Sequence, residues 1–146
     1  MKIDRIEVFG VAVPLIGEYK NAYRSKTVQK SAIVRITANG GAVGLGNIDP
    51  SPGYSKETIE DNLRVLETML APLVAGMDPA NVHRVLQKIG PAVEGFLDAK
   101  AAIEMACVDL TARACGVPVY TYLCGAVKDT LLFNAWIGIL PPDEAA

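Results

Sequence analysis

The side chains that could act as acids, bases or nucleophiles are scattered along the 146 residues of this chain. His83 is the only histidine, so this chain alone cannot supply a catalytic triad or a histidine-rich metal site. A structural or surface role is the better interpretation of a lone histidine that has no visible partner. Cys107, Cys115 and Cys124 lack metal-type spacing, and they predict reduced, buried thiols in a cytoplasmic protein.

The carboxylates have structural explanations. Glu57, Glu60 and Asp61 are expected in the first turns of a helix, where the helix dipole favours acidic side chains. Asp109 borders an apolar helix face and precedes Arg113 by four residues, a spacing that predicts an ion pair. A chemical role for Asp109 is the alternative that the sequence leaves open. No carboxylate is therefore assigned to catalysis or to a metal.

Three tyrosines stand out because they fall in two irregular stretches. Tyr19 and Tyr23 lie in the segment 14–30, and Tyr54 ends a second segment that begins at Ile48. A link of about seventeen residues is long for a hairpin, and such loops are often lids, binding loops or disordered segments. The tyrosines could contact a ligand or simply pack the loops down, and both interpretations remain open.

The first half of the chain predicts a three-stranded antiparallel meander. Pro14 is expected to end the first strand, and Asn39-Gly40-Gly41 to form a tight turn between the second and third strands. The glycines from Gly40 to Gly46 lack the spacing of a dinucleotide-binding loop, so nucleotide binding is not indicated. The expected strands are Lys2–Val13, Ser31–Ala38 and Ala42–Asn47.

A bundle of three helices is predicted after the meander. Ser55 is expected to cap the first helix, which runs to about Ala71, and Asp78-Pro79 to start the second, which ends at Gly90-Pro91. The third helix begins at Asp98 and is apolar on two sides, so it must be covered on two sides. Its two apolar faces consist of Ala99, Ala102, Ile103, Ala106, Cys107, Leu110 and Ala114, and of Ala101, Met105, Val108 and Ala112.

The end of the chain predicts an unfinished unit. Leu131 to Leu140 is an apolar run typical of a buried strand, and the prolines, acids and alanines from Pro141 to Ala146 predict the start of a helix. A strand that leads into a helix opens a β/α unit, and one such unit cannot cover its own strand. We therefore expect this sequence to be the front portion of a longer protein, or to require a second chain.

Composition and charge exclude some partners. Hydrophobic residues make up 51% of the chain, which indicates a compact globular protein rather than a disordered one. The net charge is −2 without a basic cluster, so nucleic acid or an acidic membrane is not expected as a main partner. No apolar run approaches the roughly 20 residues that a membrane-spanning helix needs.

The helix that begins at Asp98, together with the turn after it, resembles the signature of the mandelate racemase and muconate lactonizing enzyme family, within the enolase superfamily. Cys107 and Tyr122-Leu123-Cys124-Gly125 depart from the usual residues, as changes in packing. The order of the other motifs agrees, with Gly41 to Gly46 at the end of the meander and Gly76-Met77-Asp78-Pro79 between two helices. The matching signature positions are Ala101, Ala102, Ile103, Glu104, Ala106, Asp109, Leu110, Ala112, Arg113, Pro118, Val119 and Gly125.

This resemblance implies an α+β fold in two parts. Residues 1–125 correspond to a capping domain, a three-stranded antiparallel meander followed by a helical bundle, and residues 126–146 to the first strand of a (β/α)₇β barrel that is otherwise missing. In the family, acidic side chains of the barrel bind Mg²⁺, and barrel acid/base groups abstract the proton next to a carboxylate. Racemisation, epimerisation, cycloisomerisation or dehydration follows. The catalytic residues and metal ligands are expected beyond Ala146, so this chain alone is expected to be inactive.

The resemblance also implies where a substrate is contacted. Two capping-domain loops of the family close over the barrel mouth, and they correspond here to about Ile16 to Lys26 and Ile48 to Tyr54. The expected partners are a small carboxylate substrate, the rest of the barrel or a companion chain, and further copies in a homo-oligomer. The alternative hypothesis is a free-standing α+β binding or interaction module without catalysis. The candidate substrate contacts are Tyr19, Tyr23 and Tyr54, with Lys20 or Arg24 for a second anionic group.

Overall fold

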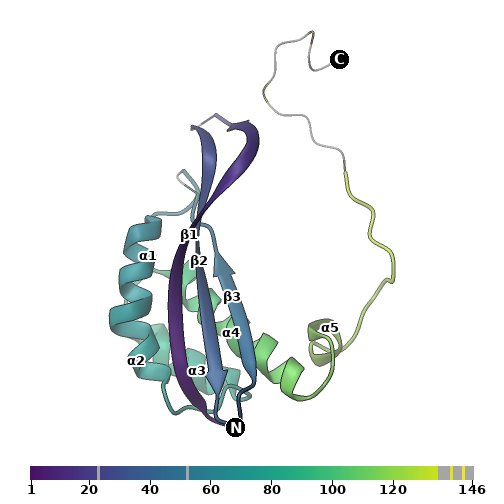
Figure 1. Cartoon of the computed structure of the whole chain (residues 1–146). Helices are drawn as coiled ribbons and strands as arrows, with labels where there is room; N and C mark the ends of the chain where they lie inside the picture. The colour runs from purple at the N-terminus through teal and green to yellow at the C-terminus, as the bar shows by residue number, and fades with distance from the viewer. Residues whose placement is uncertain (23, 52, 135–138, 140–142, 144–146) are drawn as a thin grey trace.

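An antiparallel sheet of three strands forms one layer of the structure. In the computed structural model, residues 1–22, 24–51, 53–134, 139 and 143 are described. The strands are β1 (Ile3–Lys20), β2 (Ser25–Ala38) and β3 (Val43–Ile48), in the spatial order β1-β2-β3 (Figure 1). The predicted meander is confirmed. Gly40 and Gly41, with φ of 102° and 88°, form the turn between β2 and β3.

The hairpin of β1 and β2 is longer than the sequence predicted. Pairing continues past Pro14 to Lys20, which lies opposite Ser25, with one irregularity in the register. The prediction that Pro14 ends the first strand is wrong, because β1 is an edge strand, where a residue without a backbone N–H is tolerated. The predicted loop is therefore mostly strand. The chain reverses between Asn21 and Arg24, where the N–H of Asn21 donates to the Arg24 carbonyl at 3.0 Å.

The helical bundle predicted after the meander is confirmed, and its main helices lie against one face of the sheet (Figure 1). The first predicted helix is interrupted by a π-helical turn just before Pro72. The second ends at Gly90 as expected. The helical elements are α1 (Ile59–Val65), η1 (Leu66–Leu70), α2 (Ala71–Val74), α3 (Val82–Ile89), η2 (Gly90–Ala92), α4 (Leu97–Ala114) and α5 (Val119–Tyr122).

Two helix starts differ from the prediction. Thr58, rather than Ser55, caps α1, because its hydroxyl accepts the N–H of Asp61 at 3.1 Å and the Asp61 carboxylate accepts the Thr58 N–H at 3.4 Å. This reciprocal arrangement is a capping box. Asn81, rather than Asp78, caps α3 through its side-chain oxygen. In both cases a second polar residue closer to the helix satisfies the free N–H groups.

The core lies between the sheet and α4. Ala32, Val34 and Ile36 alternate along β2 and are all fully buried. On α4, the predicted core face is buried except at Ala114, which is exposed near the end of the helix. The other apolar face of α4 is only partly covered, since Met105 is 43% exposed. The expected second cover of this helix is thus not complete within the described part of the chain.

Two glycines of β3 allow α4 to approach the sheet closely. A Cβ atom at Gly44 would lie 2.2 Å from the Ala106 carbonyl oxygen, and one at Gly46 would lie 1.9 Å from the Ala102 carbonyl oxygen. Real Cβ atoms do not approach backbone atoms so closely, so any side chain at these positions would push the helix away. Close packing of helix on strand therefore explains Gly44 and Gly46, whereas the turn explains Gly40 and Gly41.

The segment after α5 leads away from the sheet and helices (Figure 1). Residues 131–134 have no regular secondary structure, and Leu132 and Phe133 are 96% and 89% exposed. The prediction of a buried strand is wrong for these four residues, because a strand requires a paired neighbour and an apolar cover. The rest of that run and the predicted helix start fall mainly outside the described residues. Among the helices of the described residues, none has the length and apolar character to span a bilayer.

Candidate functional site

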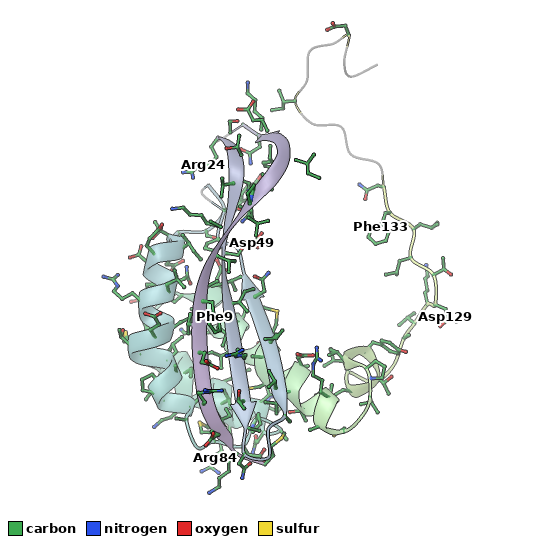
Figure 2. The ribbon with its side chains drawn as sticks, in the orientation of Figure 1. Phe9, Arg24, Asp49, Arg84, Asp129 and Phe133 are labelled. Atoms are coloured by element: carbon green, nitrogen blue, oxygen red, sulfur yellow. The ribbon has the colours of Figure 1, made fainter. Side chains whose placement is uncertain are left out.

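A hollow of about 520 Å³ lies where the tip of the β1–β2 hairpin meets the segment that follows β3. Figure 2 shows Arg24 at the hairpin tip and Asp49 at the start of that segment, toward the same end of the molecule. The two predicted loop regions therefore meet, although one of them is a strand hairpin. The hollow is lined by Tyr19, Asn21, Arg24, Lys26, Val28, Gln29 and Lys30 from the hairpin, and by Pro50, Ser51, Gly53, Tyr54, Ser55, Lys56, Glu57, Thr58, Ile59 and Glu60.

Three of the five predicted substrate contacts, Tyr19, Arg24 and Tyr54, line this hollow. Tyr54 is 74% exposed. The ring of Tyr19 lies 5.2 Å from the ammonium group of Lys26, within the range of a cation–π contact. Lys20 lies on the same hairpin but is not among the lining residues, and Tyr23 lies outside the described residues.

Basic side chains outnumber acidic ones around the hollow. Lys30 forms an ion pair with Glu60 at 2.8 Å, and this contact lowers the pKa of the Glu60 carboxyl. The carboxylate of Glu57 is also engaged, because it accepts the backbone N–H of Phe96. Arg24 and Lys56 keep the rim positive. An anionic group of a ligand is therefore the best electrostatic match for this hollow.

The carboxylate of Asp109 has the structural role that the sequence predicted. It forms an ion pair with Arg113, with a distance of 2.9 Å between Nε and Oδ1. It also accepts the backbone N–H of Leu45 at 2.9 Å, which ties the free edge of β3 to α4. The sequence indicated the first contact through its spacing of four residues, but it offered no signal for the second.

The carboxylates around the start of α1 divide into two kinds. Glu60 and Asp61 lie in the first turn of α1, as predicted, and the hydroxyl of Thr58 lowers the pKa of Asp61. Glu57 does not belong to that turn, so its assignment to the helix dipole is wrong. It reaches across to the segment before α4 instead. The capping box of Thr58 and Asp61 was a sequence signal that would have placed the helix start correctly.

The three cysteines are free thiols, but only Cys107 is buried. Burial raises the pKa of the Cys107 thiol to about 12, so it is neutral and unreactive at ordinary pH. The prediction of buried thiols is wrong for Cys115 and Cys124, which follow the ends of α4 and α5 and are exposed there. His83 is exposed on α3, in agreement with a surface role.

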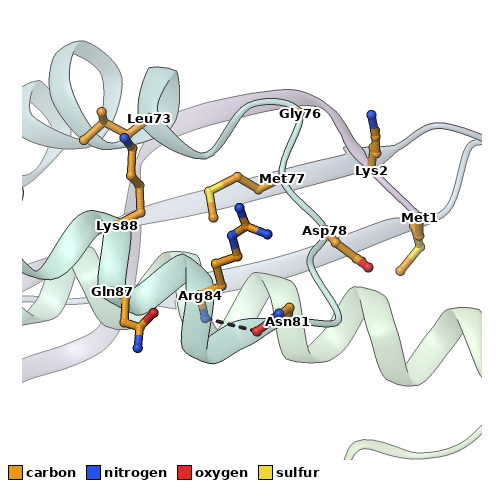
Figure 3. Close-up of a pocket in the computed structure, with 10 residues that line it drawn as sticks. All are labelled: Met1, Lys2, Leu73, Gly76, Met77, Asp78, Asn81, Arg84, Gln87 and Lys88. Atoms are coloured by element: carbon orange, nitrogen blue, oxygen red, sulfur yellow. Dashed lines mark hydrogen bonds between the residues drawn. The ribbon is translucent and has the colours of Figure 1, made fainter.

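A second hollow, of about 760 Å³, lies near the start of β1 and beside α3. Figure 3 shows the Arg84 side chain reaching toward Met77, while Lys2 and Lys88 lie on opposite sides of the space. The backbone N–H of Arg84 donates to Asn81 at 3.1 Å, as part of the helix cap. Because its charged groups do not converge, and because it contains none of the predicted contacts, this hollow is not the candidate site.

The described residues offer no metal centre. Within the described ranges, no three or more histidine, cysteine, aspartate or glutamate side chains are grouped so that they could hold a metal ion. The acids near the hairpin hollow are also committed to Lys30 and to a backbone N–H. The side chains of the described residues therefore do not form a site for the Mg²⁺ ion that the family resemblance implies.

Known proteins resemble this chain along nearly its whole length. A family profile described as "Mandelate racemase / muconate lactonizing enzyme, N-terminal domain" matches residues 5–124. L-Ala-D/L-Glu epimerase of Bacillus subtilis (strain 168) is 36% identical over 146 residues, which cover 100% of this chain and 40% of that protein. A chloromuconate cycloisomerase of Cupriavidus pinatubonensis is 38% identical over 132 residues, which cover 90% of this chain and 36% of that protein.

Solved structures agree with the sequence relatives. A dipeptide epimerase from Enterococcus faecalis V583, complexed with Mg and the dipeptide L-Leu-L-Tyr, superposes with a TM-score of 0.80 at 28% identity. The superposition covers 84% of this chain and 34% of that one. The chain thus spans well under half the length of the proteins that it matches.

Proposed function

Because this chain belongs to the mandelate racemase / muconate lactonizing enzyme family, we propose that it is the substrate-capping part of an enzyme that removes the proton next to a carboxylate. In this proposal residues 1–125 form the capping domain and residues 126–146 begin the barrel. The catalytic acid and base are supplied by barrel residues beyond this chain. The partly open face of α4 supports this division, since an apolar helix face in water requires a cover.

The hollow at the hairpin tip is the observation that carries the proposal. It gathers Tyr19, Arg24 and Tyr54 from two separate segments at one end of the molecule. Aromatic rings offer apolar contact area together with a polar group, and a guanidinium binds a carboxylate with two parallel hydrogen bonds. The same end therefore offers groups suited to cover a small organic anion. Lys20 and Tyr23 remain candidates on the same hairpin.

The proposed substrate is a small carboxylate with a second anionic group, of which a dipeptide ending in glutamate is an example. The epimerase relative is named for L-Ala-D/L-Glu, and a terminal glutamate carries two carboxylates. One carboxylate would lie next to the proton that is removed, and the other would face Arg24. Epimerisation is the reaction we propose first. Cycloisomerisation is the second candidate, supported by the chloromuconate relative.

Magnesium is the proposed metal ion, and it is held by a part of the protein other than the described residues. The support is the solved epimerase complexed with Mg, together with the family membership of this chain. Bound to a carboxylate, such an ion stabilises the charge that builds up when the neighbouring proton leaves. A cytoplasmic location and assembly into a homo-oligomer remain predictions.

The test is α-proton exchange by the whole protein in D₂O with Mg²⁺, followed by NMR on L-Ala-L-Glu and L-Ala-L-Ala. We expect exchange at the terminal residue of L-Ala-L-Glu. Replacement Arg24→Ala should raise KM for that dipeptide about tenfold while it changes KM for L-Ala-L-Ala little, because the charge-assisted hydrogen bonds to the second carboxylate are lost. Arg24→Lys retains the charge and is the matched control.

Two results would contradict the proposal. An absence of exchange with any dipeptide or other carboxylate would exclude the reaction. An equal effect of Arg24→Ala on both dipeptides would exclude recognition of the second anionic group. The 146-residue chain by itself is expected to show no exchange, so activity of that fragment would also count against the proposed division of roles.

A further inference from the structure

The segment 49–58 connects β3 to α1, and residues 50, 51 and 53–58 of it form one wall of the hairpin-tip hollow. The N–H groups of Tyr54 and Ser55 both donate to the Ser51 carbonyl, at 3.0 and 2.9 Å, and these bonds link residues within the segment. Two side-chain contacts also join this segment to α4 and to the residue that precedes α4.

The first of these contacts joins Ser55 to α4. The Ser55 hydroxyl donates to Oδ2 of Asp98 at 3.0 Å, and both residues are partly buried. Asp98 lies in the first turn of α4, where the helix dipole stabilises a carboxylate. The acceptor therefore lies on an element whose other side is packed in the core.

The second contact joins Glu57 to the residue that precedes α4. Oε1 of Glu57 accepts the backbone N–H of Phe96 at 3.0 Å. Gly95 and Phe96 both have positive φ, of 71° and 50°, an unusual conformation for a bulky residue such as phenylalanine. A Cβ atom at Gly95 would lie 2.6 Å from the same carboxylate oxygen. The backbone is thus shaped to bring this N–H against Glu57.

The receiving side of both contacts is itself held in place. The ammonium group of Lys100, on α4, donates to the carbonyl oxygens of Gly90 and Val93, at 2.9 and 2.6 Å. These bonds fasten the link between α3 and α4 to the helix. Ala99 and Ala102, on the neighbouring face of α4, are fully buried. The segment 49–58 is therefore attached to one of the most firmly packed parts of the structure.

We propose that Glu57 and Asp98 are positioning residues, which hold the segment 49–58 in the place where it closes over the substrate. The contacts Ser55–Asp98 and Glu57–Phe96 are named the 55–98 clasp. The clasp acts through the segment, so it determines substrate affinity rather than the rate of proton removal. This inference rests on the proposed function, but the attachment itself can be measured without any activity.

The test compares Glu57→Ala and Asp98→Ala with the unaltered whole protein. Amide hydrogen exchange by mass spectrometry reports the attachment, and steady-state kinetics on L-Ala-L-Glu report its consequence. We expect the amides of residues 53–58 to exchange about tenfold faster in either variant. We also expect KM to rise about tenfold while kcat changes less than about twofold.

Matched controls separate the clasp from a general loss of stability. Glu57→Gln and Asp98→Asn keep an acceptor oxygen, and they should restore slow exchange and low KM. Glu94→Ala removes an exposed carboxylate from the same link and should change neither measurement. If Glu57→Ala does not fold, Ser55→Ala removes only a hydroxyl and allows the same comparison.

Unchanged exchange of residues 53–58 in both alanine variants would overturn the clasp, whether or not the protein is active. Faster exchange with an unchanged KM, or a parallel fall in kcat, would overturn the positioning role. If the unaltered protein were inactive but both alanine variants still exchanged the amides of residues 53–58 faster, the proposed function and the positioning role would be refuted. The attachment of the segment to α4 would still be supported.

Discussion

The two ends of the β-sheet are built differently. At one end α4 lies against β2 and β3, Val34 and Ile36 are fully buried, and glycines replace side chains where the helix touches the strand. At the other end β1 and β2 extend as a two-stranded hairpin, where Ile16 is fully exposed and Tyr19 is 37% exposed. At the covered end, packing determines which residues are tolerated. At the hairpin end, side chains remain available to contact a ligand.

The largest effect on stability is expected at the covered end, from Gly46→Ala. The added methyl group would overlap the Ala102 carbonyl oxygen, so α4 would have to move away from β3. We expect a loss of about 3 kcal/mol in the free energy of unfolding, measured by urea denaturation. Gly90→Ala is the control, because nothing lies within 4 Å of its added Cβ atom. Equal stability of the two variants would contradict the close approach.

A smaller effect is expected from Asp109→Ala, which releases the edge of β3 from α4. The variant loses the acceptor for the Leu45 N–H, and we expect a loss of about 1 kcal/mol in the free energy of unfolding. Arg113→Ala removes only the ion pair, whose arginine is 63% exposed, and should cost less than about 0.5 kcal/mol. Equal losses of unfolding free energy in Asp109→Ala and Arg113→Ala would show that the hydrogen bond from Leu45 to Asp109 does not stabilise the fold.

The pH dependence of stability should respond to Glu7 on the uncovered face of the sheet. The hydrogen bond from Arg35 lowers the pKa of Glu7 below its ordinary value of 4.5 in the folded protein. Such a carboxylate stabilises the fold above its unfolded pKa, and this contribution is lost as the pH falls through the lower folded pKa. Thermal melts from pH 7 to pH 3 should therefore show a Tm advantage over Glu7→Gln that narrows toward pH 3.

The smallest effect on stability is expected at the hairpin tip. Arg24 is exposed beside the hollow, so Arg24→Ala should change the free energy of unfolding by less than about 0.5 kcal/mol. The same variant should weaken recognition of a dicarboxylate, as argued above. If Arg24→Ala lowered both the free energy of unfolding and the affinity for the dicarboxylate, the hairpin end would contribute to stability as the covered end does. That result would contradict the proposed difference between the two ends.

Local patterns in the sequence predicted most of the architecture. The alternation of Ala32, Val34 and Ile36 predicted the part of β2 from Ser31 to Ala38, although β2 begins at Ser25, and the spacing of Asp109 and Arg113 identified a real ion pair. The signature around α4 identified the family, and the family profile confirms it. The boundaries were less certain, as Ser55 and Thr58 illustrate, because two neighbouring polar residues could each cap the same helix.

The site was harder to predict than the fold. The sequence selected Tyr19, Arg24 and Tyr54, but it could not indicate that they meet at one hollow, since they come from separate segments. It explained Glu57 by the nearest helix, whereas its partner Phe96 is 39 residues away. Lys20 and Arg24 are both basic residues of the same predicted loop, but only Arg24 lines the hollow.

The sequence by itself determined the order and type of the elements and the family, because strands, helices and turns depend on neighbouring residues that share one periodicity. Only the tertiary structure decided that Pro14 lies within a strand, that Asp109 secures β3, and that α4 holds the segment beside the hollow. Each of these outcomes depends on a partner that is distant in sequence, or on a strand being at an edge. The pairing of Leu45 with Asp109, 64 residues apart, illustrates the reason: no local pattern encodes such a contact, and only packing brings the two groups together.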